Sequence, residues 1–149
     1  MSNYLEETKL LDYSDKTIQN LILEKGWHNL SGKEKIKQTY NFVRDDIKFG
    51  YNIEDSIPSS VILKDGYGQC NTKGILFMSL LRAVNIPCRF HGFTVSKEIQ
   101  KGALTGVWYM LAPEELVHSW VEVFYKEQWF ELEGFILDLD YLSAVQKNN

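Results

Sequence analysis

The chain contains 149 residues, 44% of them hydrophobic and 13% aromatic, and its formal net charge is −4. This length suits one domain over residues 1–149, and the apolar share is enough for a packed core, which excludes a disordered body. Without a Lys/Arg run or a basic stripe, we expect no nucleic-acid partner. No apolar run approaches the roughly 18 residues of a membrane span, and the N-terminus lacks the pattern of a secretory signal, so we expect neither membrane insertion nor a leader.

The few cysteines and histidines bear on compartment and metal binding. Cys70 and Cys88 form at most one pair, which is no disulfide framework, so we expect a cytoplasmic protein. His28, His91 and His118 occur without a Cys-x-x-Cys or His-x-x-x-His spacing. We therefore expect no metal and no other cofactor.

Helix signals occupy the first half of the chain after a polar segment, residues 1–16, that we expect to run extended along the surface. Apolar spacing predicts a first helix from about Asp15 to Lys25, with Gly26 as its stop. Ser31 and Glu34 fit a capping box, and the helix that follows is expected to end near residues 49–50. Residues 50–69 are predicted to be a long loop.

The second half begins with an apolar helix and continues with strands. The helix is predicted from Cys70 to Val84 and is apolar nearly all round, which is typical of a helix at the centre of a domain. Strands are predicted at residues 88–95, 117–125 and 129–132, the last two as a hairpin. Residues 96–114 are expected to form an irregular insertion that acts as a flap, and residues 138–145 a closing turn of helix. Helices followed by an antiparallel sheet give an α+β fold.

Cys70 is the candidate nucleophile. It follows a turn that contains Gly66 and Gly68 and stands at the predicted start of the apolar helix. Unpaired amide N–H groups and the positive end of the helix dipole favour a thiolate there, and the glycines allow a substrate to approach. The alternative is a buried structural cysteine. We expect this role for Cys88, which has no glycine-containing turn before it.

His118 is the candidate base. In a strand it shares a face with Trp120 and Glu122, and the indole could shield the imidazole and fix its plane. His28 and His91 are expected to be structural or surface residues.

Several acids could orient that histidine. Glu131 and Glu133 point to the same face of the hairpin as Trp129, and either could reach His118. Asp138 and Asp140 are further options. All of these acids could also be solvated surface groups, which is their usual state.

Taken in order, these motifs resemble a known family. Gly66-Tyr67-Gly68-Gln69-Cys70 precedes the apolar helix, Asn85-Ile86-Pro87-Cys88-Arg89 follows it, and His118-Ser119-Trp120-Val121-Glu122-Val123 and Trp129 come next. This series, over about residues 10 to 140, is similar to the transglutaminase-like superfamily of papain-type thiol enzymes, in the form of its single-domain bacterial members. The resemblance implies a central helix with the cysteine, packed on an antiparallel sheet that carries the histidine and the acid.

The resemblance also implies roles for individual residues. Cys70 matches the nucleophile and His118 the base, while Glu133 takes the position at which the family commonly has aspartate. Glutamate is one methylene longer, so the same hydrogen bond needs a shifted backbone or rotamer. We further expect Gln69, Tyr67 and Trp120 to contact the substrate, with Gln69 and the backbone N–H of Cys70 as candidate oxyanion donors.

The expected activity is hydrolysis of a peptide or carboxamide through an acyl-cysteine, with a peptide or protein as substrate partner. Transfer of the acyl group to an amine, which would cross-link proteins, and arylamine acyl transfer are enzymatic alternatives. A different class is a catalytically inactive peptide- or glycan-binding module lined by aromatic residues, namely Tyr51, Tyr67, Trp108, Tyr109 and Trp120. The sequence does not fix the oligomeric state.

Overall fold

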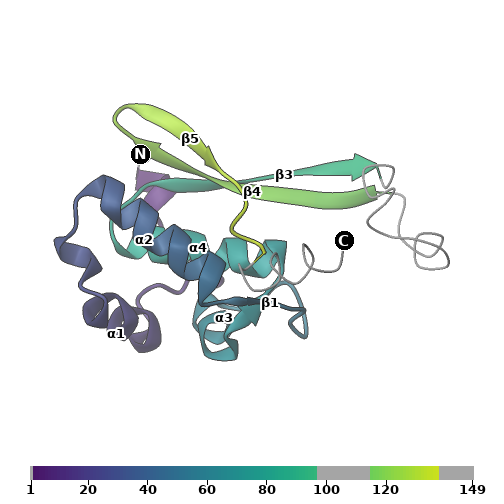
Figure 1. Ribbon diagram of the computed structural model, residues 1–149, viewed down its shortest axis with the longest axis horizontal. Coiled ribbons are helices and arrows are strands. Elements are labelled where there is room, and N and C mark those ends of the chain that lie inside the picture. Colours follow the sequence, from purple (N-terminus) through teal and green to yellow (C-terminus); the bar gives the residue numbers. More distant parts are fainter. Residues whose placement is uncertain (1, 97–114, 138–149) are drawn as a thin grey trace, which may run out of the picture.

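The computed structural model describes residues 2–96 and 115–137 and has the predicted α+β fold: helices lie together on one side of a three-stranded antiparallel sheet (Figure 1). The elements are η1 (Ser2–Leu5), α1 (Lys16–Glu24), η2 (Trp27–Asn29), α2 (Gly32–Asp45), β1 (Lys48–Phe49), α3 (Ser59–Asp65), β2 (Tyr67–Gly68), α4 (Cys70–Ala83), β3 (Cys88–Ser96), β4 (Glu115–Tyr125) and β5 (Gln128–Leu132). No helix in these two ranges is long and apolar enough to cross a membrane.

Local capping sets the limits of α1 and α2 much as the sequence predicts. The Asp15 carboxylate accepts a hydrogen bond from the Thr17 N–H at 2.8 Å, and Gly26 follows α1 with a φ of 65°. Ser31 Oγ accepts from the Glu34 N–H at 3.4 Å. However, α2 ends at Asp45, earlier than predicted: residues 46–47 turn the chain into β1, and Ile47 is buried at this turn.

The prediction of a loop over residues 50–69 is wrong. This segment contains α3, and β2 pairs in parallel with β1. The first turn of α3 has no local cap: instead, the Asp12 carboxylate accepts from the Ser60 N–H at 3.0 Å and from both the Ser59 and Ser60 hydroxyls. Because this cap comes from far away in the sequence, residues 50–69 carry no start signal of their own.

The N-terminal segment agrees in part with the prediction of an extended surface run. Residues Ser2–Leu5 form a 3-10 turn, and Leu11 is buried in the core beside the helices. The segment is joined to the start of α3, since the Ser59 N–H donates to the Leu10 carbonyl at 2.8 Å. Residues 2–10 nevertheless lie at the surface, as predicted, and Leu11 anchors the segment to the core.

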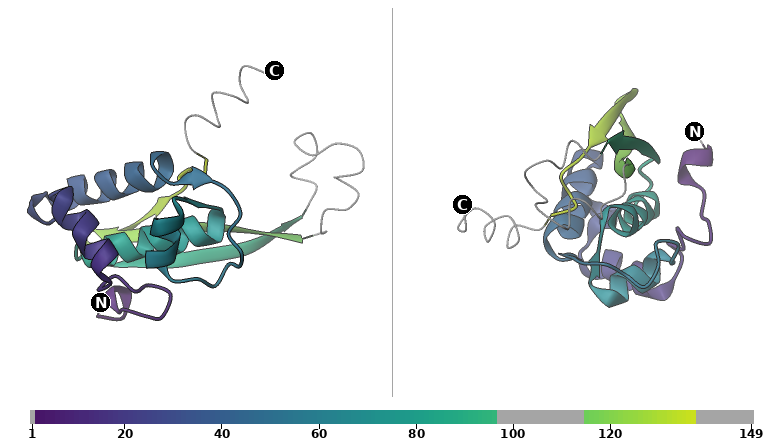
Figure 2. Two further views of the ribbon diagram at one scale, coloured as in Figure 1. Left: turned by 90° about the horizontal axis from the view of Figure 1, so that it is seen from below. Right: turned by 90° about the vertical axis from the view of Figure 1, so that its right-hand side faces the viewer.

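Helix α4 is the centre of the fold, as predicted. Most of its residues are buried, and it contacts α1, α2, α3 and the inner face of the sheet, as the views of Figure 2 show. It ends at Ala83, and Asn85, with a φ of 63°, turns the chain toward β3. Burial on every side explains why its sequence is apolar nearly all round.

The sheet has the order β3-β4-β5, and both pairs are antiparallel. The predicted hairpin is confirmed, and Lys126 and Glu127, with φ of 49° and 64°, make its two-residue turn. Ser119, Val121 and Val123 are buried on the face of β4 that packs against α4. The predicted flap and closing turn lie outside the described residues.

Candidate active site

Cys70 is the first residue of α4, so its thiol stands where the helix leaves backbone N–H groups unpaired. The preceding residue, Gln69, caps the helix: its Oε1 accepts from the Asn71 N–H at 3.0 Å, while its own N–H donates to Thr72 Oγ1 at 3.0 Å. This reciprocal pair fixes the turn that presents the thiol.

Two polar side chains, Gln69 and Asn71, lie beside the Cys70 sulfur. The thiol donates to Gln69 Oε1 at 2.8 Å and lies 3.8 Å from Asn71 Oδ1. Both neighbours are held by Asp55, whose carboxylate accepts from Gln69 Nε2 at 2.6 Å and from Asn71 Nδ2 at 3.0 Å. Sequence reasoning missed Asp55 because it belongs to the connection between β1 and α3 and has no motif around it.

The described surroundings of the thiol favour its neutral form. Burial is the largest cause that raises the pKa of Cys70 above its ordinary value, and the negative charge of Asp55 raises this pKa as well. Hydrogen bonds from the Ser119 hydroxyl and the Asn71 backbone lower the pKa. The net effect is still a pKa of Cys70 above its ordinary value. A reactive thiolate therefore needs a further positive neighbour.

Strand β4 brings the backbone of His118 to this end of α4. In the register of the sheet His118 is opposite Phe93, and the next residue, Ser119, is buried with its Oγ donating to Asn71 Oδ1 at 3.4 Å. The side chain of His118 lies outside the described part of the structure. Its pairing with Cys70 thus remains a prediction, made on the position of its strand.

Glu133 follows β5 directly, one residue beyond the pair between Leu132 and Val121. Its backbone carbonyl accepts from Tyr40 Oη at 2.7 Å, and the residue is exposed. The alternative acid Glu131 is also exposed and stands opposite Glu122 in the sheet. Asp138 and Asp140 lie outside the described residues. The choice of Glu133 as the orienting acid remains a prediction.

The three residues expected to contact a substrate have different environments. Gln69 is buried and already holds the thiol and Asp55, whereas Tyr67 is 39% exposed in β2, two residues before Gln69. Trp120 is partly buried on β4, where its ring lies 5.4 Å from that of His91. Gln69 thus contacts the thiol directly.

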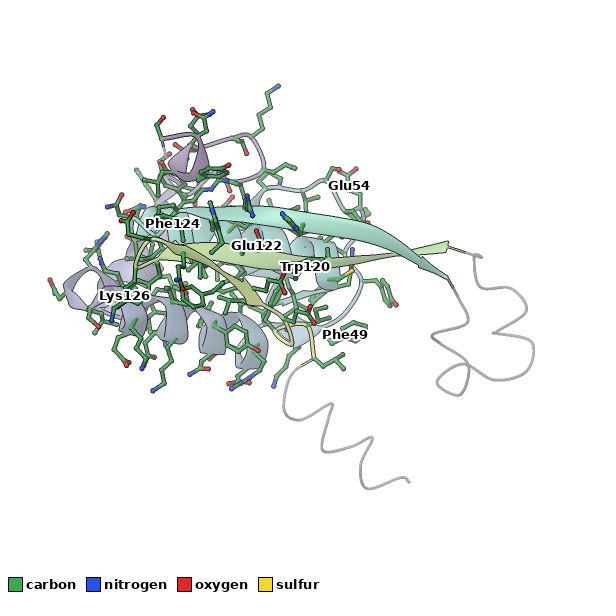
Figure 3. The ribbon with its side chains drawn as sticks, turned by 90° about the horizontal axis from the view of Figure 1, so that it is seen from above. Phe49, Glu54, Trp120, Glu122, Phe124 and Lys126 are labelled. Carbon is green, nitrogen blue, oxygen red and sulfur yellow. The ribbon has the colours of Figure 1, made fainter. Side chains whose placement is uncertain are left out.

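The sheet also carries an ion-pair cluster that the sequence did not reveal. Trp120, Glu122 and Phe124 follow one another along β4 (Figure 3). The Glu122 carboxylate is buried, pairs with the Arg89 guanidinium and lies 3.4 Å from His91 Nε2. The Arg89 guanidinium in turn stacks 4.2 Å from the centre of the Trp129 ring. These contacts give His91 a structural role in the sheet, which agrees with the prediction for this residue.

The remaining expectations concern Cys88, His28 and metals. Cys88 is fully buried, and burial raises its pKa to about 11, so its assignment to the core is confirmed. His28 is exposed in η2. Across residues 2–96 and 115–137, no group of three His, Cys, Asp or Glu side chains is placed to hold a metal ion.

In this fold a cysteine starts the central helix, and strand β4, whose sequence carries His118, contacts the first turn of that helix through Ser119 and Asn71. The sequence model of the transglutaminase-like superfamily matches residues 22–134. The chain belongs to this superfamily. A search of curated proteins finds no significant match.

A solved structure shares the fold. It is a protein from Cytophaga hutchinsonii described as a "putative cysteine protease", and it superposes with a TM-score of 0.67 at 12% sequence identity. The likeness covers 94% of this chain but 44% of that one, so the present chain spans less than half the length of its neighbour. With a sequence identity of 12%, this similarity shows that the two proteins share a fold.

Proposed function

We propose that this protein hydrolyses an amide bond of a peptide or a carboxamide through an acyl-Cys70 intermediate. The observation that carries the proposal is the position of the Cys70 thiol, half-buried at the start of α4 and one residue from the Asn71–Ser119 contact with β4. The same strand carries His118. Nucleophilic catalysis needs a base within hydrogen-bond reach of the nucleophile, and we propose that His118 serves as that base.

The proposed chemistry has two steps. The Cys70 thiolate attacks the carbonyl carbon and forms a C–S bond, the C–N bond breaks, and imidazolium His118 protonates the departing amine. His118 then takes a proton from water, which attacks the thioester and releases a carboxylic acid and the thiolate. Attack by an amine in place of water would give the cross-linking alternative by the same first step.

The other predicted residues have supporting roles in this scheme. Glu133 orients His118, and the backbone N–H of Cys70 stabilises the oxyanion. Gln69 is the second candidate donor, and its Nε2 at present donates to Asp55. We propose that Tyr67 and Trp120 contact the substrate peptide.

We also retain the cytoplasm as the proposed location and a peptide or protein as the proposed substrate partner. Both Cys70 and Cys88 are free thiols. Free thiols suit a reducing compartment, where a nucleophilic cysteine stays available.

The proposal is tested by the pH dependence of Cys70 alkylation. The rate with iodoacetamide is measured from about pH 4 to pH 9, with mass spectrometry to assign the label to Cys70. An imidazolium-paired thiolate reacts rapidly well below pH 8, and His118→Ala removes that acidic limb. His28→Ala, at an exposed histidine in η2, is the matched control and should leave the profile unchanged.

A specific observation favours a second candidate, the non-catalytic binding module. Burial and Asp55 both raise the pKa of Cys70, and two aromatic side chains near the site, Tyr51 and Tyr67, are 78% and 39% exposed. A single alkylation step near the ordinary pKa of a thiol, the same in His118→Ala, would favour this function and contradict the enzyme.

A further inference from the structure

An apolar pocket opens beside the proposed nucleophile. It has a volume of about 300 Å³ and lies between α4, β3 and the N-terminal segment. We call it the Ile75 pocket. Its main walls are Thr8, Leu11, Asn71, Ile75, Met78 and Phe90.

The pocket begins at the active site. Asn71 forms one end of it, and the Oδ1 of the same side chain lies 3.8 Å from the Cys70 sulfur. Asn71, Ile75 and Met78 are spaced four and three residues apart, so they line one face of α4. One helical turn is about 5.4 Å, which places the centre of the pocket within reach of a side chain next to the attacked carbonyl.

The walls determine what fits. In the described part of the chain no charged side chain lines the pocket, and Leu11, Ile75, Met78 and Phe90 are apolar. The volume is at the lower end of the range for ligand pockets, about 300–1,000 Å³, so it suits one side chain rather than a whole extended ligand. An ionised side chain would lose its hydration here without gaining a partner.

We propose that the Ile75 pocket binds a bulky, uncharged apolar side chain on the acyl side of the scissile amide, and so makes the protein selective for substrates with a leucine- or phenylalanine-like residue beside the attacked carbonyl. The acyl group stays bonded to Cys70 throughout the proposed reaction, so a pocket on the same helix can hold it through both steps. This inference rests on the proposed function, whose nucleophile supplies the anchoring point.

Selectivity is tested with acetylated amino-acid chloromethyl ketones that carry Leu, Phe, Gly or Asp next to the reactive carbon. Their rates of Cys70 alkylation are divided by the iodoacetamide rate. The Leu and Phe reagents should react at least about tenfold faster than the Gly reagent, the scale that a few buried methylenes give, and the Asp reagent should be slowest. Equal normalised rates for Leu and Gly would overturn the proposal.

Two variants narrow the pocket from different walls. Ile75→Phe fills it from α4, and Thr8→Phe fills it from an exposed position on the N-terminal segment. Both should abolish the preference for Leu, so that the Leu and Gly rates, each divided by the iodoacetamide rate of the same variant, become equal. Leu23→Phe, at a residue of α1 that is 67% exposed, is the matched control and should keep the preference. If the Leu reagent still reacts faster than the Gly reagent in both pocket variants, the selectivity does not come from this pocket, and the proposal is overturned.

A binding experiment separates the pocket from the chemistry. In a Cys70→Ala protein, N-acetylleucinamide should shift the methyl NMR signals of Ile75 and Met78 in a saturable way, and N-acetylglycinamide should not. The absence of Leu-specific shifts overturns the pocket proposal, whatever the reactivity of Cys70. Conversely, Leu-specific shifts in a protein whose wild-type form has no activated thiol would contradict the proposed hydrolysis and leave the pocket in place.

Discussion

At the scale of single residues, the charges around Cys70 control how easily its thiol ionises. Asp55 is the negative group that bridges Gln69 and Asn71, the two side chains on either side of the sulfur. It orders the site, yet its charge disfavours the thiolate and raises the pKa of Cys70. Asp55 therefore positions the nucleophile at some cost to its ionisation.

Asp55→Asn should make the thiol more reactive near neutral pH. Removing the carboxylate charge removes one cause of the raised pKa of Cys70, so this pKa falls toward its ordinary value. A lower pKa means more thiolate at any pH below it, and hence faster alkylation. The measurement is the iodoacetamide rate across pH, in which the rise of the rate should move to lower pH.

Glu54→Gln is the matched control for this change. Glu54 precedes Asp55 in the same connection and is exposed, so the loss of its charge should leave the profile in place. A profile that shifts equally in both variants would indicate a general charge effect. A profile of Asp55→Asn that moves to higher pH would contradict the role given to Asp55.

Glu133→Gln tests the predicted orienting acid. An amide keeps the size of the side chain but removes the charge that stabilises imidazolium, so the acidic limb of the alkylation profile should weaken severalfold. Glu131→Gln, an exposed acid two residues earlier in β5, should leave this limb unchanged. If both variants behave like wild type, another group orients His118.

At the scale of elements, the turn before α4 depends on close approach at Gly68. A Cβ there would lie 2.7 Å from Thr72 Oγ1 and 3.3 Å from the Lys73 backbone nitrogen. Thr72 Oγ1 is the acceptor for the Gln69 N–H, so a side chain at Gly68 presses on the cap that presents Cys70. Glycine is required here by packing rather than by a left-handed backbone.

Gly68→Ala should therefore lower the free energy of unfolding by about 1–3 kcal/mol and change the alkylation profile of Cys70. Gly66→Ala is the comparison: Gly66 has a φ of 73° but open space around its Cβ position. It should cost about 1–2 kcal/mol through backbone strain and leave the profile alone. Urea denaturation and alkylation together distinguish the two, and an unchanged profile in Gly68→Ala would contradict the account of the turn.

The elements also show which features a sequence can reveal. Helix α1, helix α4 and the β4–β5 hairpin have local caps, an apolar pattern or a turn, and all were predicted. Helix α3 was missed because Asp12 supplies its cap from the N-terminal segment. The same division holds at the site: Cys70 has a motif, whereas Asp55 and Ser119 reach it only through tertiary contacts.

At the scale of the whole molecule, one buried lysine of α4 joins the junction of α2 and β1 to the chain beyond β5. Lys73 is fully buried in α4, and its Nζ donates to the carbonyls of Arg44, Ile47 and Ile136 at 3.2, 2.7 and 2.9 Å. The first carbonyl belongs to the last turn of α2, where the helix leaves acceptors unpaired and its dipole favours a cation. The third lies three residues after Glu133. The central helix thus holds α2, the start of β1 and the chain beyond β5 in one arrangement.

Lys73→Met should destabilise the whole fold. Methionine preserves most of the side-chain volume but donates nothing, and each buried acceptor left without a partner costs about 1–3 kcal/mol. The expected loss in the free energy of unfolding is at least about 2 kcal/mol, measured by urea denaturation. Lys64→Met, at an exposed position of α3, is the control and should change stability by less than about 0.5 kcal/mol. Equal stabilities for the two variants would mean that apolar packing, and not the three hydrogen bonds of the ammonium, joins these segments to α4.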